Sequence, residues 1–411
     1  MIEYLETKVF PDAVKNQAFG ADIKKFIEFV PSVQKGADHF ASDVTFGKVI
    51  LENGTGQTVE ERVVIKIQPE SEIARKIFNC DGQFSNELLF YTDVCPLFKK
   101  YDTDGVLKKN FAELVYGKAT NGVNRNEDIL VFKDLNAKGF RLTEKKAFID
   151  ETHIKLALNA IAKYHALSFK CLANEPEAFN EVVSKLQPAY VEDLENSDAP
   201  KDLDYLALST GRGIAPLEND PDYKDRLSDI RKNCERADFW KRKYWGPSES
   251  FNVIAHGDFC RNNMMFKYGD DGQPVDVVFF DMATLKFCSP TVDTSFFLIL
   301  NTSSQVKRAH WDNFLKTYYD VLSGQLDGHP AKPTFDQICL DWRTKSVLGY
   351  YLSSFFLPTM IVEREKENVL KDGFDPEAIA KDMLELGGPK VTALISEIVK
   401  FMLDKDFIFE H

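Results

Sequence analysis

The sequence predicts an α+β protein with a small β-rich N-terminal lobe and a larger helical C-terminal lobe. The chain has 411 residues, which is too long for one small domain and suits two lobes. Short β-branched segments and one helical segment occupy roughly the first 130 residues. Long helical patterns dominate the remainder, and 33 phenylalanines can fill a sizeable core.

Each N-terminal element follows from hydrophobic spacing and from the residues that end it. The elements expected are a helix at 21–30 ended by Pro31, strands at 45–51 and 63–67 with a hairpin turn signal at Asn53-Gly54, a helix at 84–94 ended before Pro96, and a strand at 129–132. Together they predict a small sheet combined with helical segments.

The second part of the chain is predicted to be mainly helical. The elements expected are a helix at 152–170, an irregular proline-rich insertion at 186–222, a strand pair at 264–281 turning at 269–272, and helices at 307–323, 341–370, 376–386 and 390–403. The uncharged stretch Ser346–Val362 is short for a membrane span, holds Gly349 and Pro358, and is interpreted as a buried helix.

Charge and cysteine content narrow the function classes. The 51 Lys and Arg against 64 Asp and Glu leave a net charge of −13, which argues against a nucleic-acid-binding protein. The seven cysteines are scattered and form no CxxC pair, so thiols in a reducing cytosol are expected rather than structural zinc. The first residues resemble no targeting signal, and we therefore expect a cytoplasmic protein without membrane association.

The segment from His256 to Asn263 carries the chemistry. Asp258 is followed five residues later by Asn263, and a predicted hairpin then delivers Asp281 after an apolar strand. In phosphoryl transfer, a loop Asp orients or accepts the proton of the acceptor hydroxyl, while an Asn and a second Asp hold Mg²⁺. Oxygen ligands suit this hard cation. A loop turn and a strand-end cap are the structural alternative for the same residues.

Two upstream features fit the same chemistry. Lys66 lies within an apolar strand, where an unpaired charge would be costly, and Glu87 on the next helix could satisfy it. Such a Lys–Glu pair grips the α- and β-phosphates of a nucleotide. The turn from Gly36 to Ser42 could cover the phosphates, although its single glycine is equally typical of an ordinary loop.

These residues resemble the ecdysteroid kinase-like (CHK kinase-like) family, within the aminoglycoside phosphotransferase and choline kinase superfamily. The resemblance spans roughly residues 30–300. The matching segments are Gly36–Ser42, Val63–Ile67, Glu87–Tyr91, Leu130–Leu135, Leu158–His165, and Ile254–Pro290 with Asp293.

The resemblance implies a protein kinase-like two-lobed fold, with an ATP-binding lobe at 1–133 and a catalytic and acceptor-binding lobe at 134–411. It also implies roles for individual residues: Asp258 as the catalytic base, Asn263 and Asp281 as Mg²⁺ ligands, Lys66 with Glu87 as the phosphate clamp, and the backbone of Asp134 and Leu135 beside the adenine. The chain departs from the family at Met282-Ala283, where Phe-Gln is usual, and at Lys133, where Glu is usual.

A small molecule is the expected acceptor rather than a protein. Only eleven residues separate Asp281 from Asp293, which leaves no room for a phosphoregulated activation segment. His256-Gly257-Asp258 also lacks the Arg that pairs with an activation-loop phosphate. Asp293 is expected to brace the catalytic loop, and His165 to be a buried histidine with its hydrogen bonds satisfied.

The predicted function is ATP- and Mg²⁺-dependent phosphorylation of a hydroxyl group on an ecdysteroid-like or other apolar metabolite. A choline- or aminoglycoside-type kinase and a catalytically inert, ligand-binding pseudokinase are the alternatives. A monomer is expected, with a dimer as the other possibility. The aromatic residues Tyr350, Tyr351, Phe355 and Phe356 could line an apolar acceptor site, or they could belong to the C-terminal core.

Overall fold

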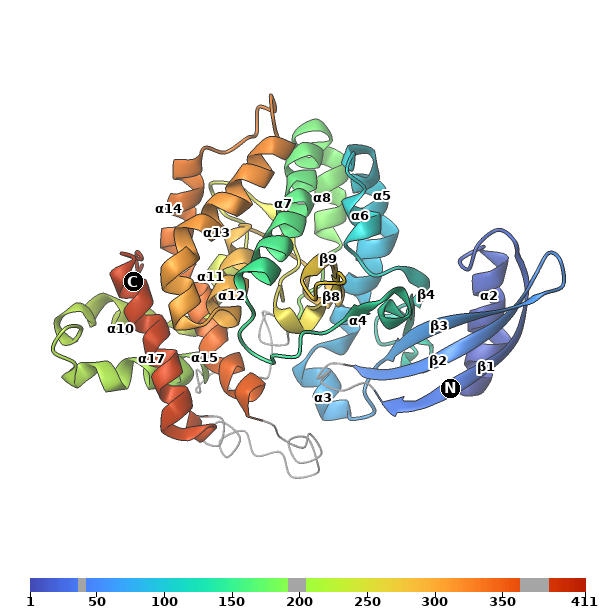
Figure 1. Cartoon of the computed structure of the whole chain (residues 1–411), viewed down its shortest axis with the longest axis horizontal. Coiled ribbons are helices and arrows are strands. Elements are labelled where there is room, and N and C mark those ends of the chain that lie inside the picture. The colour runs from blue at the N-terminus through green and yellow to red at the C-terminus, as the bar shows by residue number, and fades with distance from the viewer. Residues whose placement is uncertain (36–41, 191–204, 363–383) are drawn as a thin grey trace.

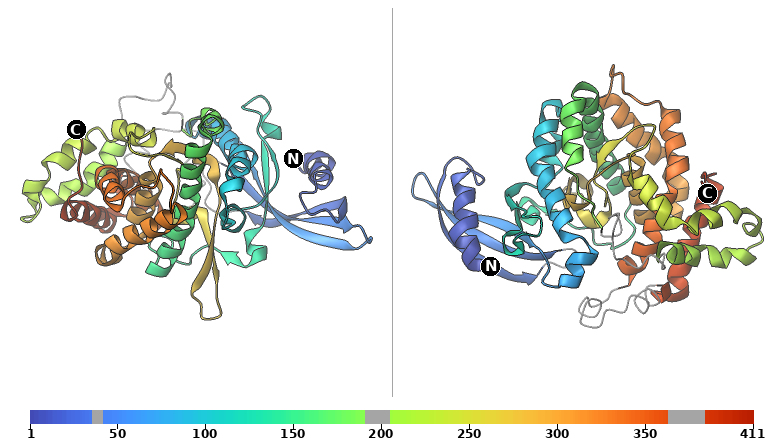
Figure 2. Two further views of the ribbon diagram at one scale, coloured as in Figure 1. Left: turned by 90° about the horizontal axis from the view of Figure 1, so that it is seen from above. Right: turned by 180° about the vertical axis from the view of Figure 1, so that it is seen from behind.

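The computed structural model describes residues 1–35, 42–190, 205–362 and 384–411. A sheet and an N-terminal helical segment form one end of the molecule, and the long helices form the other (Figure 1). Figure 2 shows the same separation from above and from behind. The predicted α+β, protein kinase-like arrangement is therefore confirmed: a small antiparallel sheet precedes a larger helical part that surrounds a β-hairpin.

The sheet has five strands in the order β1-β2-β3-β5-β4, and all neighbours are antiparallel. Their bounds are β1 (Ile23–Lys35), β2 (Asp43–Asn53), β3 (Thr58–Ile67), β4 (Leu114–Lys118) and β5 (Ile129–Lys133). One face of the sheet packs on α1 (Ile2–Tyr4), η1 (Leu5–Val9) and α2 (Phe10–Lys15), with Phe10 fully buried. The strands predicted at 45–51, 63–67 and 129–132 are all present.

The helix predicted at 21–30 is wrong, because these residues form strand β1. Ile23, Phe26 and Phe29 face the core at three-residue spacing, as on a helix. That spacing arises because the register against β2 shifts between Ile23 and Lys25 and again between Phe26 and Glu28. Pro31 does not end the strand, since β1 lies at the sheet edge, where a missing N–H is tolerated.

The helix predicted at 84–94 runs further than expected. It begins as α4 (Cys80–Leu89), continues as the π-helical turn η2 (Phe90–Val94), and extends through Pro96 in α5 (Cys95–Phe98). Pro96 occupies the first turn of α5, a position that requires no N–H from proline. Two short helices lie on either side of this segment, α3 (Glu72–Ile77) and α6 (Val106–Lys109).

The helical part is built around α7 (Glu151–Asn174), as predicted. The other helices are α8 (Pro176–Ser184), α9 (Tyr205–Ile214), α10 (Ser228–Cys234), α11 (Ala237–Trp245), α12 (Thr291–Asn301), α13 (Ser304–Gln325), α14 (Phe335–Lys345), α15 (Val347–Ile361) and α17 (Gly388–Asp404). They share one large apolar core with the hairpin strands. The insertion predicted to be irregular at 186–222 contains helix α9, so that prediction is wrong at 205–214.

Three further predictions have mixed outcomes. The helix predicted at 341–370 is divided at Ser346 into α14 and α15, and the rest of it falls mostly outside the described residues. The helix predicted at 376–386 also lies largely outside them. Ser346–Val362 does form a buried helix. Among the described residues, no helix has both the length and the apolar character needed to cross a membrane.

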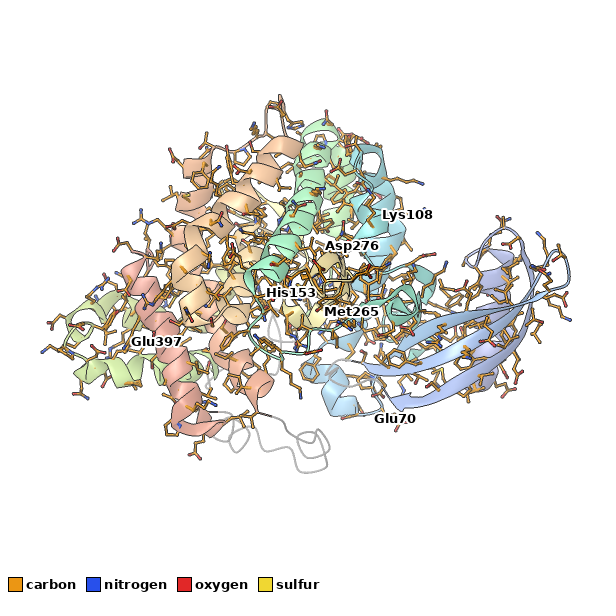
Figure 3. The ribbon with its side chains drawn as sticks, in the orientation of Figure 1. Glu70, Lys108, His153, Met265, Asp276 and Glu397 are labelled. Carbon is orange, nitrogen blue, oxygen red and sulfur yellow. The ribbon has the colours of Figure 1, made fainter. Side chains whose placement is uncertain are left out.

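The hairpin between the helices positions the predicted site. Strands β8 (Met264–Tyr268) and β9 (Pro274–Phe279) pair with each other, and β6 (Phe140–Arg141) pairs with β8. Strands β7 (Val253–Ala255) and β10 (Lys286–Cys288) form a second small ladder. In Figure 3 the labelled Met265 and Asp276 mark the hairpin, with His153 of α7 beside it. His153 Nε2 lies 3.0 Å from the hydroxyl oxygen of Tyr268 on β8.

Lys307 on α13 makes stability depend on pH. Its Nζ donates to the carbonyl oxygen of Ile299 at 2.6 Å, near the end of α12, and burial lowers the pKa of Lys307 to about 7. In the unfolded chain the pKa of lysine is about 10.4, so the unfolded state binds more protons between these values. Stability should therefore rise with pH above about 7, by at most about 1.4 kcal/mol per unit from this group.

We expect Lys307→Met to remove that rise. Chemical unfolding at pH 7.5, 8.5 and 9.5 would measure the slope for both proteins, and other titrating groups contribute equally to each. Lys316→Met is the control, because Lys316 is an exposed residue of the same helix. Parallel pH profiles for the Lys307 variant and the unsubstituted protein would contradict the prediction.

Candidate active site

Lys66, Glu87 and Asp281 meet although they come from β3, α4 and the end of the hairpin. Lys66 Nζ lies 2.6 Å from Glu87 Oε2 and 2.6 Å from Asp281 Oδ1. Lys66 and Glu87 are almost completely buried, whereas about a quarter of the Asp281 side chain is exposed. The ion pair that the sequence predicts between Lys66 and Glu87 is present, and Asp281 joins it.

The charges of this cluster do not balance. Burial alone would lower the pKa of Lys66, but the carboxylates of Asp281 and Glu87 raise it above its ordinary value, so the ammonium stays charged. Burial raises the pKa of Glu87, and the charge of Lys66 opposes that rise. One ammonium thus serves two carboxylates. With both ionised, one negative charge is left over, which favours a cation beside Asp281.

Asp293 braces the loop that carries Asp258. It lies on α12, and its two carboxylate oxygens accept the backbone N–H groups of His256 and Gly257, each at 2.8 Å. His165 contacts Asp293 Oδ2 at 3.1 Å and the hydroxyl oxygen of Tyr318 at 2.8 Å, with no exposed surface. Burial would raise the pKa of Asp293, but the hydrogen bond and charge of His165 lower it overall. Both residues therefore have the structural surroundings that the sequence predicted.

Gly257 allows the loop to turn closely against the segment after Asp281. Its φ of +82° is left-handed, and a Cβ atom there would lie 1.9 Å from the carbonyl oxygen of Thr284. Thr284 Oγ1 also donates to the carbonyl oxygen of His256 at 3.0 Å. Sequence reasoning missed Thr284, because only the folded chain brings these two loops together.

Asp258 is held by Asn263, the residue five positions later. Asn263 Nδ2 donates to Asp258 Oδ2 at 2.8 Å and to the Asp258 carbonyl oxygen at 2.9 Å. Burial raises the pKa of Asp258, and the negative charge of Asp281 adds to the rise, whereas His256 and Asn263 oppose it. A carboxylate with a raised pKa is a better proton acceptor than an ordinary Asp, provided that it remains ionised.

The hairpin brings Asn263 and Asp281 to the same end of the strands. Met264 pairs with Phe279, and the N–H of Phe280 donates to the carbonyl oxygen of Asn263 at 3.0 Å. Asp281 then adopts a left-handed conformation with φ of 65°, which Asp accepts more readily than most residues.

This donor set fits a magnesium ion. Because Nδ2 of Asn263 is engaged as a donor, its Oδ1 oxygen is the atom suited to a cation, together with the Asp281 carboxylate. Magnesium often takes one or two such ligands and completes its shell with water and phosphate oxygens. The described residues contain no group of three or more His, Cys, Asp or Glu side chains arranged for a metal ion. A site with few protein ligands is consistent with that finding.

Of the remaining predicted nucleotide-binding residues, those that the structure describes lie just before β2 and just after β5. Ser42 is buried immediately before β2, whereas Gly36 lies outside the described residues. The N–H of Asp134 donates to the carbonyl oxygen of Arg62 on β3, and Asp134 Oδ1 accepts from the N–H of Asn136 at 2.9 Å. Leu135 is buried beside them. Since the N–H of Asp134 is already used, an adenine contact would fall to other backbone groups of this turn.

Lys133, one of the departures from the family pattern, has a partner of its own. Its Nζ lies 2.6 Å from Glu113 Oε1, and Lys138 contacts the other oxygen of Glu113 at 3.0 Å. Lys133 therefore has a carboxylate partner outside the Lys66 cluster, and it shares that partner with Lys138.

The sequence model of the ecdysteroid kinase-like family matches residues 36–328, which is more than half of the chain. No curated protein is significantly similar in sequence. Among solved structures, the ADP-bound aminoglycoside phosphotransferase APH(2'')-Ib is 12% identical, with a TM-score of 0.38, over 98% of this chain and 100% of that one. A ternary complex of APH(2")-IIa with streptomycin and ATP is 14% identical, with a TM-score of 0.36, over 98% and 99% of the two chains. Likenesses this distant carry no weight for substrate or mechanism.

Proposed function

Because the chain belongs to the ecdysteroid kinase-like family, we propose that it is an ATP-dependent phosphotransferase that phosphorylates a hydroxyl group of a small molecule. The observation that carries the proposal is the convergence of Lys66, Glu87 and Asp281 next to the pair formed by Asp258 and Asn263. The cluster offers a cation for phosphate oxygens, carboxylate and amide oxygens for magnesium, and a partly exposed carboxylate that can accept a proton.

The proposal assigns a role to each residue of the site. Asp258 orients the acceptor hydroxyl and accepts its proton, and Asn263 holds Asp258 in place through Nδ2. Lys66, fixed by Glu87, binds phosphate oxygens, and Asn263 and Asp281 hold the metal. Bound ATP would supply the phosphoryl group, and Mg²⁺ would neutralise its charge. Ser42 with the Gly36 turn, and Asp134 with Leu135, complete the proposed nucleotide site.

The proposal also includes a lobe boundary after Lys133, with nucleotide bound by residues 1–133 and the acceptor by 134–411. All five strands of the large sheet precede that boundary, which supports it. The helices after α4 precede this boundary in the sequence but pack with the helical part, because Phe90, Phe98 and Val106 belong to the same apolar core as α7. The N-terminal part is thus anchored in the helical part through these side chains.

We propose an ecdysteroid-like or other apolar acceptor. The proposal rests on the family to which the chain belongs and on the uncharged helix α15. Two of the four aromatic residues considered for an acceptor wall are core residues. Tyr350 and Tyr351 have no exposed surface, and their hydroxyls donate to the carbonyl oxygen of Thr210 and to Asn233 Oδ1. Phe355 and Phe356 are partly exposed, with ring centroids 5.1 Å apart. Any aromatic contribution to acceptor binding from this helix therefore rests on these two.

The substitution Phe355→Ala tests whether Phe355 contacts the acceptor or only packs in the core. If Phe355 contacts an apolar acceptor, its loss should raise the acceptor KM about 10-fold, since about 1.5 kcal/mol of apolar contact disappears. The ATP KM and the melting temperature should hardly change. Tyr351→Ala is the matched comparison one turn earlier, and it should cost about 3–5 kcal/mol of stability. An unchanged acceptor KM in the Phe355 variant would remove Phe355 from the acceptor site.

The proposed function is tested by release of ADP from Mg²⁺-ATP in the presence of hydroxylated compounds. A panel should contain steroids with several hydroxyl groups, choline and aminoglycosides, and the product should be identified by mass. Phosphorylation of the steroids alone would support the apolar acceptor. Phosphorylation of choline or aminoglycosides would overturn that choice but keep the kinase. Nucleotide binding without transfer to any compound would favour a ligand-binding pseudokinase.

A further inference from the structure

Asn86 immediately precedes Glu87 on α4 and has no role in the mechanism proposed above. Its side chain is completely buried. A buried amide must find partners for its N–H groups and its oxygen, or the fold loses the energy of those hydrogen bonds. The partners that Asn86 has found are all backbone groups of distant segments.

Asn86 joins α4 to two segments that lie far away in the sequence. Its Nδ2 donates to the carbonyl oxygen of Gln187 at 2.9 Å and to that of Ala283 at 3.2 Å. Its Oδ1 accepts the N–H of Gln187 at 2.8 Å. The amide is thus paired with the peptide of Gln187 on one side and attached to the turn η10 (Met282–Thr284) on the other.

The contact with η10 lies directly beside the proposed metal ligand. Glu87 accepts a hydrogen bond from the backbone of Met282, and Asn86 donates to the carbonyl oxygen of Ala283. Two consecutive residues of α4 therefore hold two consecutive residues of the turn that follows Asp281. Since Asp281 has a left-handed backbone, its side-chain direction depends on how this turn is held. The family departure at Met282-Ala283 leaves these contacts intact, because they use backbone atoms.

Two other residues of the same region contact the segment 187–189 that Asn86 holds at Gln187. Gln83 Nε2 donates to the carbonyl oxygen of Ala189 at 2.9 Å, and Asn79 Nδ2 donates to that of Pro188. Gly82 permits the close approach, since a Cβ atom there would lie 2.6 Å from the Pro188 carbonyl oxygen. Gln83 and Asn79 hold the 187–189 segment, but among the described residues their side-chain hydrogen bonds do not reach η10.

We propose that Asn86 is a positioning residue for the proposed phosphoryl transfer: it fixes η10 against α4, so that Asp281 and the Lys66–Glu87 pair keep one spacing. This inference rests on the proposed function of the site. A buried amide with its donors and acceptor engaged cannot shift without breaking hydrogen bonds, so the turn has one preferred position. Displacement of a positioned group by about 1 Å can cost about 100-fold in rate.

Asn86→Ala and Gln83→Ala form a matched pair. Both remove a buried amide from the same helix and loosen the same 187–189 segment, but only the first removes the contact with Ala283. Amide hydrogen exchange of the free protein, followed on peptides covering 279–287, reports the turn without any nucleotide. Calorimetric titration with ATP, with and without Mg²⁺, and turnover at varied Mg²⁺ then report the site.

We expect Asn86→Ala to speed exchange across 281–285 and to raise the Mg²⁺ concentration for half-maximal turnover several-fold. Turnover at saturation should fall about 10-fold to 100-fold, with the acceptor KM unchanged. Gln83→Ala should leave the exchange of 281–285 and the Mg²⁺ dependence within about 2-fold of the unsubstituted protein. Equal effects of the two variants would overturn the proposal, as would a lower melting temperature for Asn86→Ala with unchanged exchange and Mg²⁺ dependence.

Two further measurements keep the test decisive. If Asn86→Ala does not fold, Asn86→Ser leaves a smaller void and a hydroxyl, and the same expectations apply to it. If the unsubstituted protein transfers no phosphoryl group, the proposed function fails, but the exchange comparison still reports whether Asn86 holds the turn. Faster exchange without a change in Mg²⁺-dependent ATP binding would overturn the positioning role while leaving the kinase proposal intact.

Discussion

Asp258→Asn is expected to lower turnover by about 10²–10⁴-fold while ATP still binds, because the loss of a proton acceptor typically costs that much. The substitution keeps the size of the side chain, and Asn263 Nδ2 can still donate to its remaining oxygen. The Asp293 contacts to His256 and Gly257 should persist, since they involve only backbone N–H groups. The loop should therefore stay in place and lose only its carboxylate.

Turnover by ADP release and ATP affinity by calorimetry would measure this change. Asp276→Asn is a matched control, because Asp276 lies on β9 of the same hairpin. Within the part of the chain that the structure describes, its carboxylate accepts a hydrogen bond only from the N–H of Val277. That variant should retain turnover and melting temperature. Near-normal turnover in Asp258→Asn would exclude Asp258 as the group that activates the acceptor.

Asp281→Ala should abolish the Mg²⁺-dependent part of nucleotide binding. Without this carboxylate the metal would keep one protein ligand, Asn263, and a cation with so few ligands is weakly held. The variant also frees Lys66 from one of its two ion pairs, leaving Glu87 as its carboxylate partner at 2.6 Å. Metal-free ATP should therefore bind about as well as before, or somewhat better, because Lys66 becomes available to phosphate oxygens.

Titration with ATP in EDTA and in excess Mg²⁺ distinguishes the Mg²⁺-dependent part of nucleotide binding from the metal-free part. The unsubstituted protein should bind more tightly with Mg²⁺, and Asp281→Ala should show the same affinity in both conditions. Asp271→Ala, in the exposed turn of the hairpin, is the control and should behave as the unsubstituted protein. If Asp281→Ala still binds ATP more tightly in Mg²⁺ than in EDTA, the metal must lie elsewhere.

The fold could be predicted wherever residue spacing matched regular geometry. The strands β2, β3 and β5, the hairpin β8–β9 and the helix α7 follow from alternation, turn residues and helical periodicity. The strand β1 could not be predicted, because its bulges give Ile23, Phe26 and Phe29 a helical spacing. The helix end predicted before Pro96 was wrong for a different local reason. Proline usually ends a helix, but it is tolerated in a first helical turn, which is its position in α5.

The residues of the candidate site could be predicted from the sequence, whereas the contacts that support them could not. Asp258, Asn263 and Asp281 stand out because their residue types and their spacing within one hairpin match those that phosphoryl transfer uses, and their roles stay predictions. The ion pair between Lys66 and Glu87 was predictable because a lysine in an apolar strand needs a carboxylate. Thr284 and Asn86 were not predictable, because each acts through backbone groups of a distant segment, and a backbone partner leaves no signature in residue type.

The sequence by itself determined the kind of fold and the groups available for chemistry, because side-chain type and local spacing control both. Tertiary structure alone decided that Asp281 shares Lys66 with Glu87, that Asn86 fastens α4 to the turn beside it, and that Tyr350 and Tyr351 are core residues. These contacts join positions that are 118 to 215 residues apart. Such distant pairs are set by how the folded chain packs, which no local pattern encodes.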